Sequence, residues 1–179
     1  FRERYLSNPD HPNVFEGKAV MFEGPEDYHH RINSNKLKID ENSILMVRGC
    51  GPVGYPGSAE VVNMQPPDRL LKQGINALPT LGDGRQSGTS ESPSILNVSP
   101  ESAVGGDLAI VKTGDKIRID LNKSRVDLLI STAEFKKRRK KKKISKLISQ
   151  TPWQEISRDT VGQLEDGACI NSRGVYLDI

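Results

Sequence analysis

The sequence has little of several residue types, and each shortage excludes a class of protein. Its two cysteines, Cys50 and Cys169, cannot form a disulfide framework or a four-thiolate metal site. No apolar run approaches the ~18 residues that a membrane-spanning helix needs, and the first residues show no signal-peptide pattern. We therefore expect a reduced, cytoplasmic compartment and no membrane partner. Because the sequence begins without Met, we also expect it to be a piece of a longer protein.

Aromatic residues are also scarce, at 5% of the chain, and the positive charge is concentrated in one run. Residues 136–143 read KKRRKKKK; outside this run, 18 basic residues stand against 23 acidic ones, so the rest of the chain carries about −5. Modules that read nucleic-acid bases combine stacking aromatics with a spread basic face, so we expect no nucleic-acid partner. The run continues into Ile144, Leu147 and Ile148 at helical spacing, which favours a solvated lysine-rich helix. A localisation signal or a polyanion-binding segment is the alternative.

Short apolar segments separated by turns predict a chain of mixed α and β structure. In KIRIDL, residues 116–121, apolar and charged residues alternate as in a half-buried strand. Pro66 and Pro67 before DRLLKQG are typical of the start of a short helix. The other segments that favour regular structure are strands at 18–22, 43–48, 75–81, 108–112 and 125–131 and a helical turn at 25–32. Because the strands do not alternate regularly with helices, we predict an α+β, mainly β domain with a barrel-like sheet.

We expect residues 1–179 to form a single domain with less regular ends. Residues 1–42 are polar and turn-rich, and we interpret them as an irregular N-terminal segment around the predicted strand and helical turn. Residues 132–179 are predicted to hold the basic helix and a C-terminal tail. In that tail, the spacing of the apolar residues favours packing on one face: Trp153, Ile156, Val161 and Leu164.

Two glycine-rich loops follow predicted strands. Gly49-x-Gly51-x-x-Gly54 matches the dinucleotide fingerprint, but Pro52 and Pro56 interrupt the helix that should hold a pyrophosphate, so we exclude that function. Loops at strand ends carry ligand sites in many folds, and glycine lets the backbone approach a ligand closely. The polar residues that these loops deliver are Glu60 after the first and Asp83, Arg85, Ser87, Thr89, Ser90 and Glu91 on the second.

These side chains suit two kinds of ligand. A carboxylate suits a hard cation such as Mg²⁺, and hydroxyls in a tight turn suit an oxyanion or a hydroxylated substrate. The alternative is a pair of structural turns whose hydroxyls bond local amides. The three histidines, His11, His29 and His30, all lie in the N-terminal polar region, and no Ser-His-Asp arrangement is indicated.

Four motifs together resemble one family. They are GPVGYPG at 51–57, DGRQSG at 83–88, SPESAVGGDLA at 99–109 and GDKIRID at 114–120. The sequence is similar, over nearly its whole length, to the C-terminal domain of the dihydroxy-acid dehydratase / phosphogluconate dehydratase family. The wording of YPGSAEVVNM, GDGRQSGTS and TPWQEI resembles the sugar-acid branch, which includes arabinonate and xylonate dehydratases, more than the branched-chain branch.

The resemblance implies a fold, a reaction and roles for three residues. It implies a swivelling β-barrel-like domain flanked by helices, and the dehydration of a sugar acid to a 2-keto-3-deoxy acid. An iron–sulfur cluster, of the 2Fe–2S type, and Mg²⁺ are the implied cofactors. By motif match, Ser87 is the base that takes the C2 proton, Thr89 is its neighbour on the substrate, and Glu60 is a Mg²⁺ ligand. A cation beside a hydroxyl lowers its pKa, which makes a serine base chemically reasonable.

The resemblance also implies that this chain holds part of a site. Cluster ligation takes about four protein ligands, so we expect the cluster and most Mg²⁺ ligands in an N-terminal domain that is absent here, an isolated chain that is inactive, and a homo-oligomer, dimer or tetramer. Glu91 and the KKRRKKKK run depart from the family pattern. The alternatives are a branched-chain dihydroxy-acid dehydratase domain and a stand-alone barrel that binds a partner without catalysis.

Overall fold

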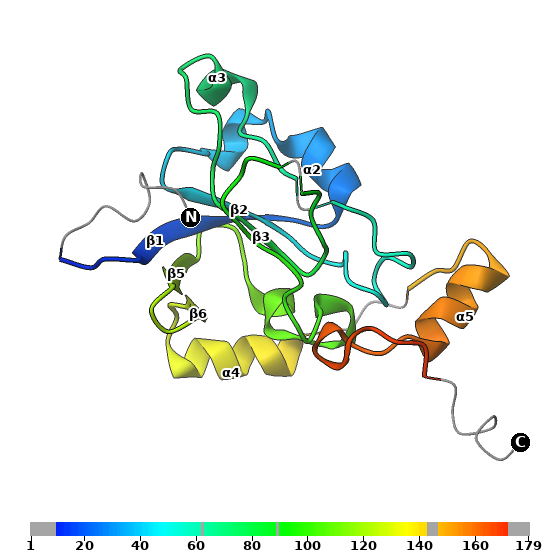
Figure 1. Ribbon diagram of the computed structural model, residues 1–179. Coiled ribbons are helices and arrows are strands. Elements are labelled where there is room, and N and C mark those ends of the chain that lie inside the picture. The colour runs from blue at the N-terminus through cyan, green and yellow to red at the C-terminus, as the bar shows by residue number, and fades with distance from the viewer. Residues whose placement is uncertain (1–9, 62, 89, 143–146, 172–179) are drawn as a thin grey trace, which may run out of the picture.

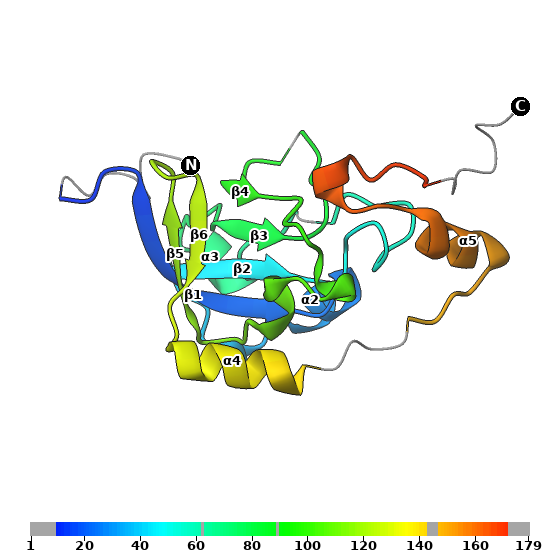
Figure 2. The same ribbon diagram turned by 90° about the horizontal axis from the view of Figure 1, so that it is seen from below.

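A curled, mixed sheet of six strands organises the chain. The structure is a computed structural model that describes residues 10–61, 63–88, 90–142 and 147–171. The strand order is β4-β3-β2-β1-β5-β6, and the sheet curls into a half-barrel with a few flanking helices (Figure 1). Seen from below, β5 and β6 stand almost across the direction of β1, β2 and β3 (Figure 2). The predicted α+β, mainly β class with a barrel-like sheet is confirmed.

The strand bounds follow the sequence pattern closely in the middle of the sheet. β2 is buried at all five positions because its sequence, SILMV, is packed on both faces. It pairs in parallel with β1 and β3, and β3 pairs in parallel with β4; β5 pairs antiparallel with both β1 and β6. The strands are β1 (Val14–Phe22), β2 (Ser43–Val47), β3 (Thr80–Gly82), β4 (Ser94–Ile95), β5 (Lys116–Asp120) and β6 (Arg125–Leu128).

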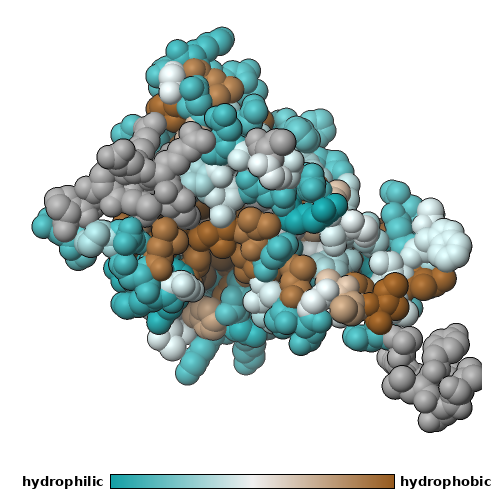
Figure 3. Space-filling model, viewed as in Figure 1, coloured by the Kyte–Doolittle hydropathy of each residue, from teal (hydrophilic) through white to brown (hydrophobic). Residues whose placement is uncertain are grey.

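Each face of the sheet packs against its own set of helices. One core cluster includes Phe22, Val47 and Leu70, and is covered by α2 (Pro25–Arg31), the short 3-10 helix η1 (Asn35–Leu37) and α3 (Asp68–Leu71). The other includes Met46 and Ile117 and is covered by the 3-10 helix η3 (Asp107–Ile110). Beside this second cluster lies an apolar cavity of about 300 Å³, which Phe135 of α4 (Thr132–Lys141) also lines. Hydrophobic residues gather in the middle of the face shown in Figure 3.

Two sequence expectations need correction. Residues 108–112 are not a strand: they follow the 3-10 helix η2 (Ser102–Val104) and lie largely in η3, and Arg48 takes the carbonyls of Leu108, Ala109 and Val111 as acceptors. The segment is apolar because it covers the sheet, so its composition alone suggested a strand. The predicted strand at 75–81 begins later, at Thr80. The strand predicted at 18–22 is confirmed: it is β1, which begins earlier, at Val14, and lies between β2 and β5.

The C-terminal helices also differ from expectation. The basic helix α4 ends at Lys141, and residues 143–146 of the run and its continuation lie outside the described residues. The spacing of apolar residues predicted that one face of α5 (Pro152–Thr160) packs against the fold. This face is not buried: Trp153 is 79% exposed and Ile156 is 51% exposed. The 3-10 helix η4 (Leu164–Asp166) follows. Within the described residues, no helix is both long enough and apolar enough to cross a bilayer.

Candidate functional site

Both glycine loops leave the sheet at the same edge. The strands β1, β2 and β3 run in parallel, so their C-terminal ends lie together, on the side where α5 lies (Figure 2). The first loop, residues 49–57, follows β2, and the second loop, residues 83–91, follows β3. In sheets of parallel strands, this edge is where loops most often build ligand sites. The sequence expectation that the two loops belong to one region is consistent with this topology.

The end of the first loop runs beside the second loop. Glu60 and Arg85 form an isolated parallel bridge, and the Val61 N–H donates to the Arg85 carbonyl at 3.1 Å. Further along the two segments, the backbone N–H of Ser87 donates to Asn63 Oδ1 at 3.2 Å. We call this pairing of residues 58–61 and Asn63 with residues 85–87 the loop crossing. It brings the segments that carry Glu60 and Ser87 side by side.

Glu60 presents a carboxylate that the protein does not bury. Its Oε1 lies 3.3 Å from Arg85 Nη1, and the Glu60 and Arg85 side chains are 44% and 51% exposed. Arg85 is held in turn by its Nε–H, which donates to the Ser58 carbonyl. An exposed pair of this kind contributes little to stability, because water screens both charges. The carboxylate is therefore oriented but still accessible to a ligand.

Ser87 lies in a short turn of the second loop. Ser87 is half-buried. Its carbonyl accepts a hydrogen bond from the Ser90 N–H at 3.1 Å, and this bond closes the turn over Gly88. The hydrogen bond from the Ser87 N–H to Asn63 fixes the turn against the first loop. Thr89, the other predicted catalytic residue, lies outside the described residues.

A polar cavity of about 270 Å³ lies beside this turn. Every residue that lines it has an amide, hydroxyl or carboxylate side chain: Asn63, Gln65, Asn76, Ser90, Glu91 and Ser92. Nearby in the sequence, Gln86 carries a buried Oε1 that has no hydrogen-bond partner within the described residues. Buried acceptors are rarely left without a partner.

Asp83 does not line the site as the sequence predicted. Its side chain is 0% exposed and accepts four hydrogen bonds. Two come from the N–H groups of Gly49 and Cys50, at 3.1 and 2.8 Å, and two come from the N–H and the hydroxyl of Ser102, at 2.9 and 2.5 Å. The carboxylate is fully used in joining the first loop to η2, so it anchors backbone instead of binding a ligand.

A second buried carboxylate, Glu101, escaped the sequence analysis altogether. It is 0% exposed and accepts from the N–H groups of Val53 and Gly54 at 2.9 and 2.8 Å, and from Gln163 Nε2 at 2.9 Å. A Cβ on Gly51 would lie 2.5 Å from a Glu101 carboxylate oxygen, so this position needs glycine. The sequence signal was SPES at 99–102, whose acidic residue follows Pro in a motif that suggested only a helix start.

The described residues fit one ligand of a magnesium ion, and they do not fit an iron–sulfur cluster. Among them, no group of three or more His, Cys, Asp or Glu side chains is placed to hold a metal. Burial raises the pKa of the Cys50 thiol, and the carboxylates of Asp83, Glu26 and Glu101 raise it further. Cys50, which is buried, and Cys169 are the two cysteines of the chain, and a cluster takes about four protein ligands. Glu60 offers an accessible oxygen of the kind that Mg²⁺ prefers.

Comparison with known proteins identifies the family. The model of the dihydroxy-acid/6-phosphogluconate dehydratase C-terminal family matches residues 6–168. The chain belongs to this family. It is 56% identical to a D-xylonate dehydratase of Caulobacter vibrioides over 179 residues, which is 100% of this chain and 30% of that protein. It is 48% identical to an L-arabinonate dehydratase of Rhizobium leguminosarum bv. trifolii over 128 residues, 72% of this chain and 22% of that protein.

The chain is also similar to family members that are named for a different substrate. A dihydroxy-acid dehydratase of Thermodesulfovibrio yellowstonii is 42% identical over 127 residues, 70% of this chain and 22% of that protein. The chain thus spans less than a third of the length of these relatives. The resemblance to the sugar-acid branch, expected from the motifs, is confirmed by the higher identity to the xylonate and arabinonate enzymes.

Proposed function

We propose that this chain is the C-terminal domain of a hydro-lyase that dehydrates a sugar acid to a 2-keto-3-deoxy acid. The observation that carries the proposal is the loop crossing, where an accessible carboxylate, Glu60, and a serine in a fixed turn, Ser87, lie on paired segments. The 56% identity to a D-xylonate dehydratase over the whole chain supports the same reaction class.

In the proposed reaction, Ser87 first loses its hydroxyl proton to solvent, and the resulting alkoxide Oγ accepts the proton from C2 of the acid. The electron pair of the C2–H bond forms a C2–C3 double bond, and the C3–O bond breaks, so that the C3 hydroxyl leaves as water after protonation. The enol that remains tautomerises to the 2-keto acid. Proton transfer by a positioned side chain contributes about 10²–10⁴-fold to such a rate. Thr89, two residues further along the loop, would contact the substrate beside Ser87.

Glu60 would hold Mg²⁺ by one oxygen. When bound, the cation supplies positive charge that lowers the pKa of an adjacent hydroxyl and binds substrate oxygens. Arg85 orients the Glu60 carboxylate, and Asn63 keeps the Ser87 turn against the same segment. We assign the iron–sulfur cluster, and the remaining cation ligands, to an N-terminal domain of the longer protein, because the residues of this chain do not fit them.

The polar cavity beside the Ser87 turn favours a polyhydroxylated substrate. Amide, hydroxyl and carboxylate groups line it throughout, so they can exchange hydrogen bonds with substrate hydroxyls and would be left without partners by an alkyl tail. A branched-chain dihydroxy acid presents such a tail. This cavity therefore supports an aldonate substrate over the branched-chain alternative.

The full-length protein tests the proposal. We expect it to convert pentonates or hexonates to 2-keto-3-deoxy acids at least ~100-fold more efficiently, in kcat/KM, than alkyl 2,3-dihydroxy acids, because a site built for hydrogen bonds rejects analogues that lack them. The products are measured by chromatography of the 2-keto acid. Preference for the alkyl acid would favour the branched-chain alternative, and conversion of neither acid would favour a binding module without catalysis. The cytoplasmic location and the dimer or tetramer are parts of the same proposal.

A further inference from the structure

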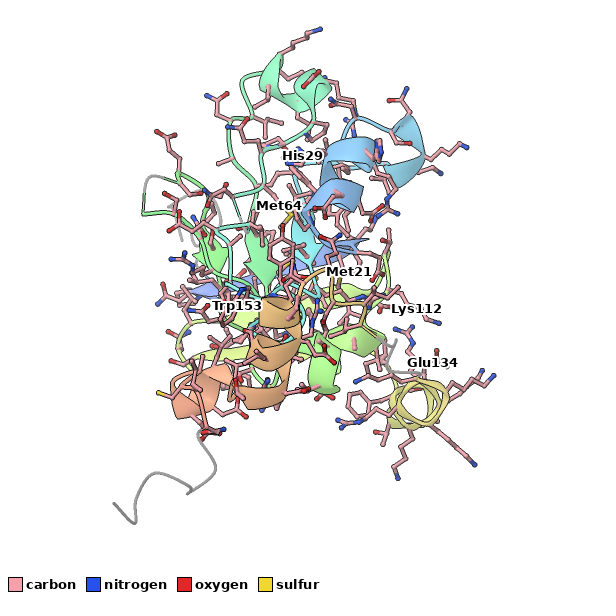
Figure 4. All side chains as sticks on the ribbon, turned by 90° about the vertical axis from the view of Figure 1, so that its right-hand side faces the viewer. Met21, His29, Met64, Lys112, Glu134 and Trp153 are labelled. Carbon is pink, nitrogen blue, oxygen red and sulfur yellow. The ribbon has the colours of Figure 1, made fainter. Side chains whose placement is uncertain are left out.

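A second cavity, remote in sequence from the two glycine loops, lies between α4 and η3. Its volume is about 410 Å³, within the range of small-ligand pockets. Cationic side chains dominate its lining, with one carboxylate among them: Arg48, Lys112, Lys137, Arg138, Lys141, Lys142 and Glu134. Figure 4 looks along α4 and shows its side chains radiating outward, with Glu134 and Lys112 on the same side of the molecule.

The two arginines of this cavity are neutralised within the fold. Arg138 binds Asp115 at 2.5 Å and Glu134 at 2.8 Å, and its side chain is only 12% exposed. Arg48 donates from Nε to Glu23 at 2.8 Å and from Nη1 to backbone carbonyls. These ion pairs and hydrogen bonds hold α4 and η3 in place, and carboxylates of the fold balance the charges of the two arginines. They are structural.

The four lysines of the lining are not neutralised in this way. Within the described residues, the Lys137 ammonium group forms a long 3.8 Å pair with Glu134, and that of Lys142 donates to the Gly106 carbonyl at 3.3 Å. Glu134 is already occupied by Arg138. The C-terminal end of a helix attracts cations with only about half an elementary charge. Four ammonium groups around one cavity exceed what that end can offset.

Lys142 is the one lysine of this lining that the fold partly buries, and this burial lowers the pKa of its ammonium group. Because the charges surround a cavity, the geometry differs from that of a helix whose lysines only face solvent.

We propose that this cavity binds a compact anion that carries two or more phosphate groups. Lysine ammonium groups bind phosphate as point charges. Several lysines that line one cavity favour an anion that carries several negative charges. The cavity, which lies between η3 and α4, has room for a small molecule. The proposal is independent of the dehydratase reaction.

Isothermal titration of the full-length protein with inorganic tripolyphosphate tests the site, with two double variants on the same helix. Lys137→Gln with Lys141→Gln removes two charges from the cavity lining. Lys136→Gln with Lys140→Gln removes two exposed charges that do not line it. We expect the first pair to weaken binding by at least ~10-fold and the second by less than ~3-fold, because direct contacts outweigh the screened field of distant charges. Equal losses from both pairs, or no binding at 0.1 M salt (about a 10 Å Debye length), would overturn the proposal.

Competitors identify the source of the anion. Pyrophosphate and a sugar bisphosphate should displace tripolyphosphate, whereas citrate at the same concentration should displace it poorly. A single-stranded oligonucleotide that binds more tightly than tripolyphosphate, with a steep salt dependence that both double variants reduce alike, would replace the proposal by a diffuse polyanion surface. Circular dichroism of each variant verifies that α4 is retained.

Discussion

The first glycine loop and the loop crossing lie at the same edge of the sheet, but they use carboxylates in opposite ways. The first loop is held by Asp83 and Glu101, both 0% exposed and both bonded to backbone N–H groups. The loop crossing carries Glu60, which is 44% exposed and has a single screened partner in Arg85. Buried carboxylates here give the loop its shape, and the exposed one is free to exchange its partner for a ligand.

This difference predicts which substitutions lower the free energy of unfolding and which ones weaken ligand binding. Removing a buried carboxylate leaves several donors without acceptors, at about 1–3 kcal/mol for each unsatisfied group. Removing an exposed one changes little. Variants of the buried carboxylates should therefore lose mainly stability, and variants of the exposed carboxylate should lose mainly ligand binding, when both are measured.

The largest effect on stability is expected at Glu101. Glu101→Ala removes the acceptor of the Val53 and Gly54 N–H groups and of Gln163 Nε2, so these three donors lose a buried partner. We expect the free energy of unfolding to fall by about 3 kcal/mol or more, measured by urea denaturation.

The conservative variant sharpens this prediction. In Glu101→Gln, the side-chain NH₂ group faces a backbone N–H donor, so part of the bonding is lost and part is kept. Its loss of stability should lie between zero and that of Glu101→Ala. If Glu101→Ala unfolds at the same urea concentration as the wild type, the account of the first loop is wrong.

The smallest effect on stability is expected at Glu60. Glu60→Gln should change the free energy of unfolding by no more than about 0.5 kcal/mol, because the Arg85 pair is exposed. The same change should weaken Mg²⁺ binding by the full-length protein by at least ~10-fold, since a neutral amide is a poorer ligand for a hard cation. Calorimetric titration with Mg²⁺ measures this directly, and unchanged affinity would remove Glu60 from the metal site.

Local patterns in the sequence predicted most of the sheet. Ile117 and Ile119 alternate with charged residues, and both are buried in β5. The run SILMV predicted β2 almost to the residue. Pro66 and Pro67 correctly announced α3. In each case, the cause of the structure lies within a few residues of sequence, so the pattern was sufficient.

The misses share a physical reason, which is that their cause lies far along the chain. Residues 107–110 form η3, in which the carbonyls of Leu108 and Ala109 accept hydrogen bonds from Arg48, about sixty positions earlier. Glu101 meets Gln163 and the first loop, and no local pattern announces that contact. Trp153 was predicted to be buried by its spacing, but spacing does not say whether a partner surface exists, and it is exposed. The site residues Glu60 and Ser87 were reached through family motifs, and their roles stay predictions.

We propose that Ser87 accepts the C2 proton, and the rate of deuterium release from C2 reports on this step. The full-length protein and its Ser87→Ala variant are given an aldonate deuterated at C2, and release of that deuterium is followed by NMR, with Ser124→Ala, an exposed serine after β5, as the matched control. The account predicts that Ser87→Ala slows C2–D cleavage by ~10³-fold or more while Ser124→Ala matches the wild type. Cleavage by Ser87→Ala within ~10-fold of the wild-type rate would contradict it.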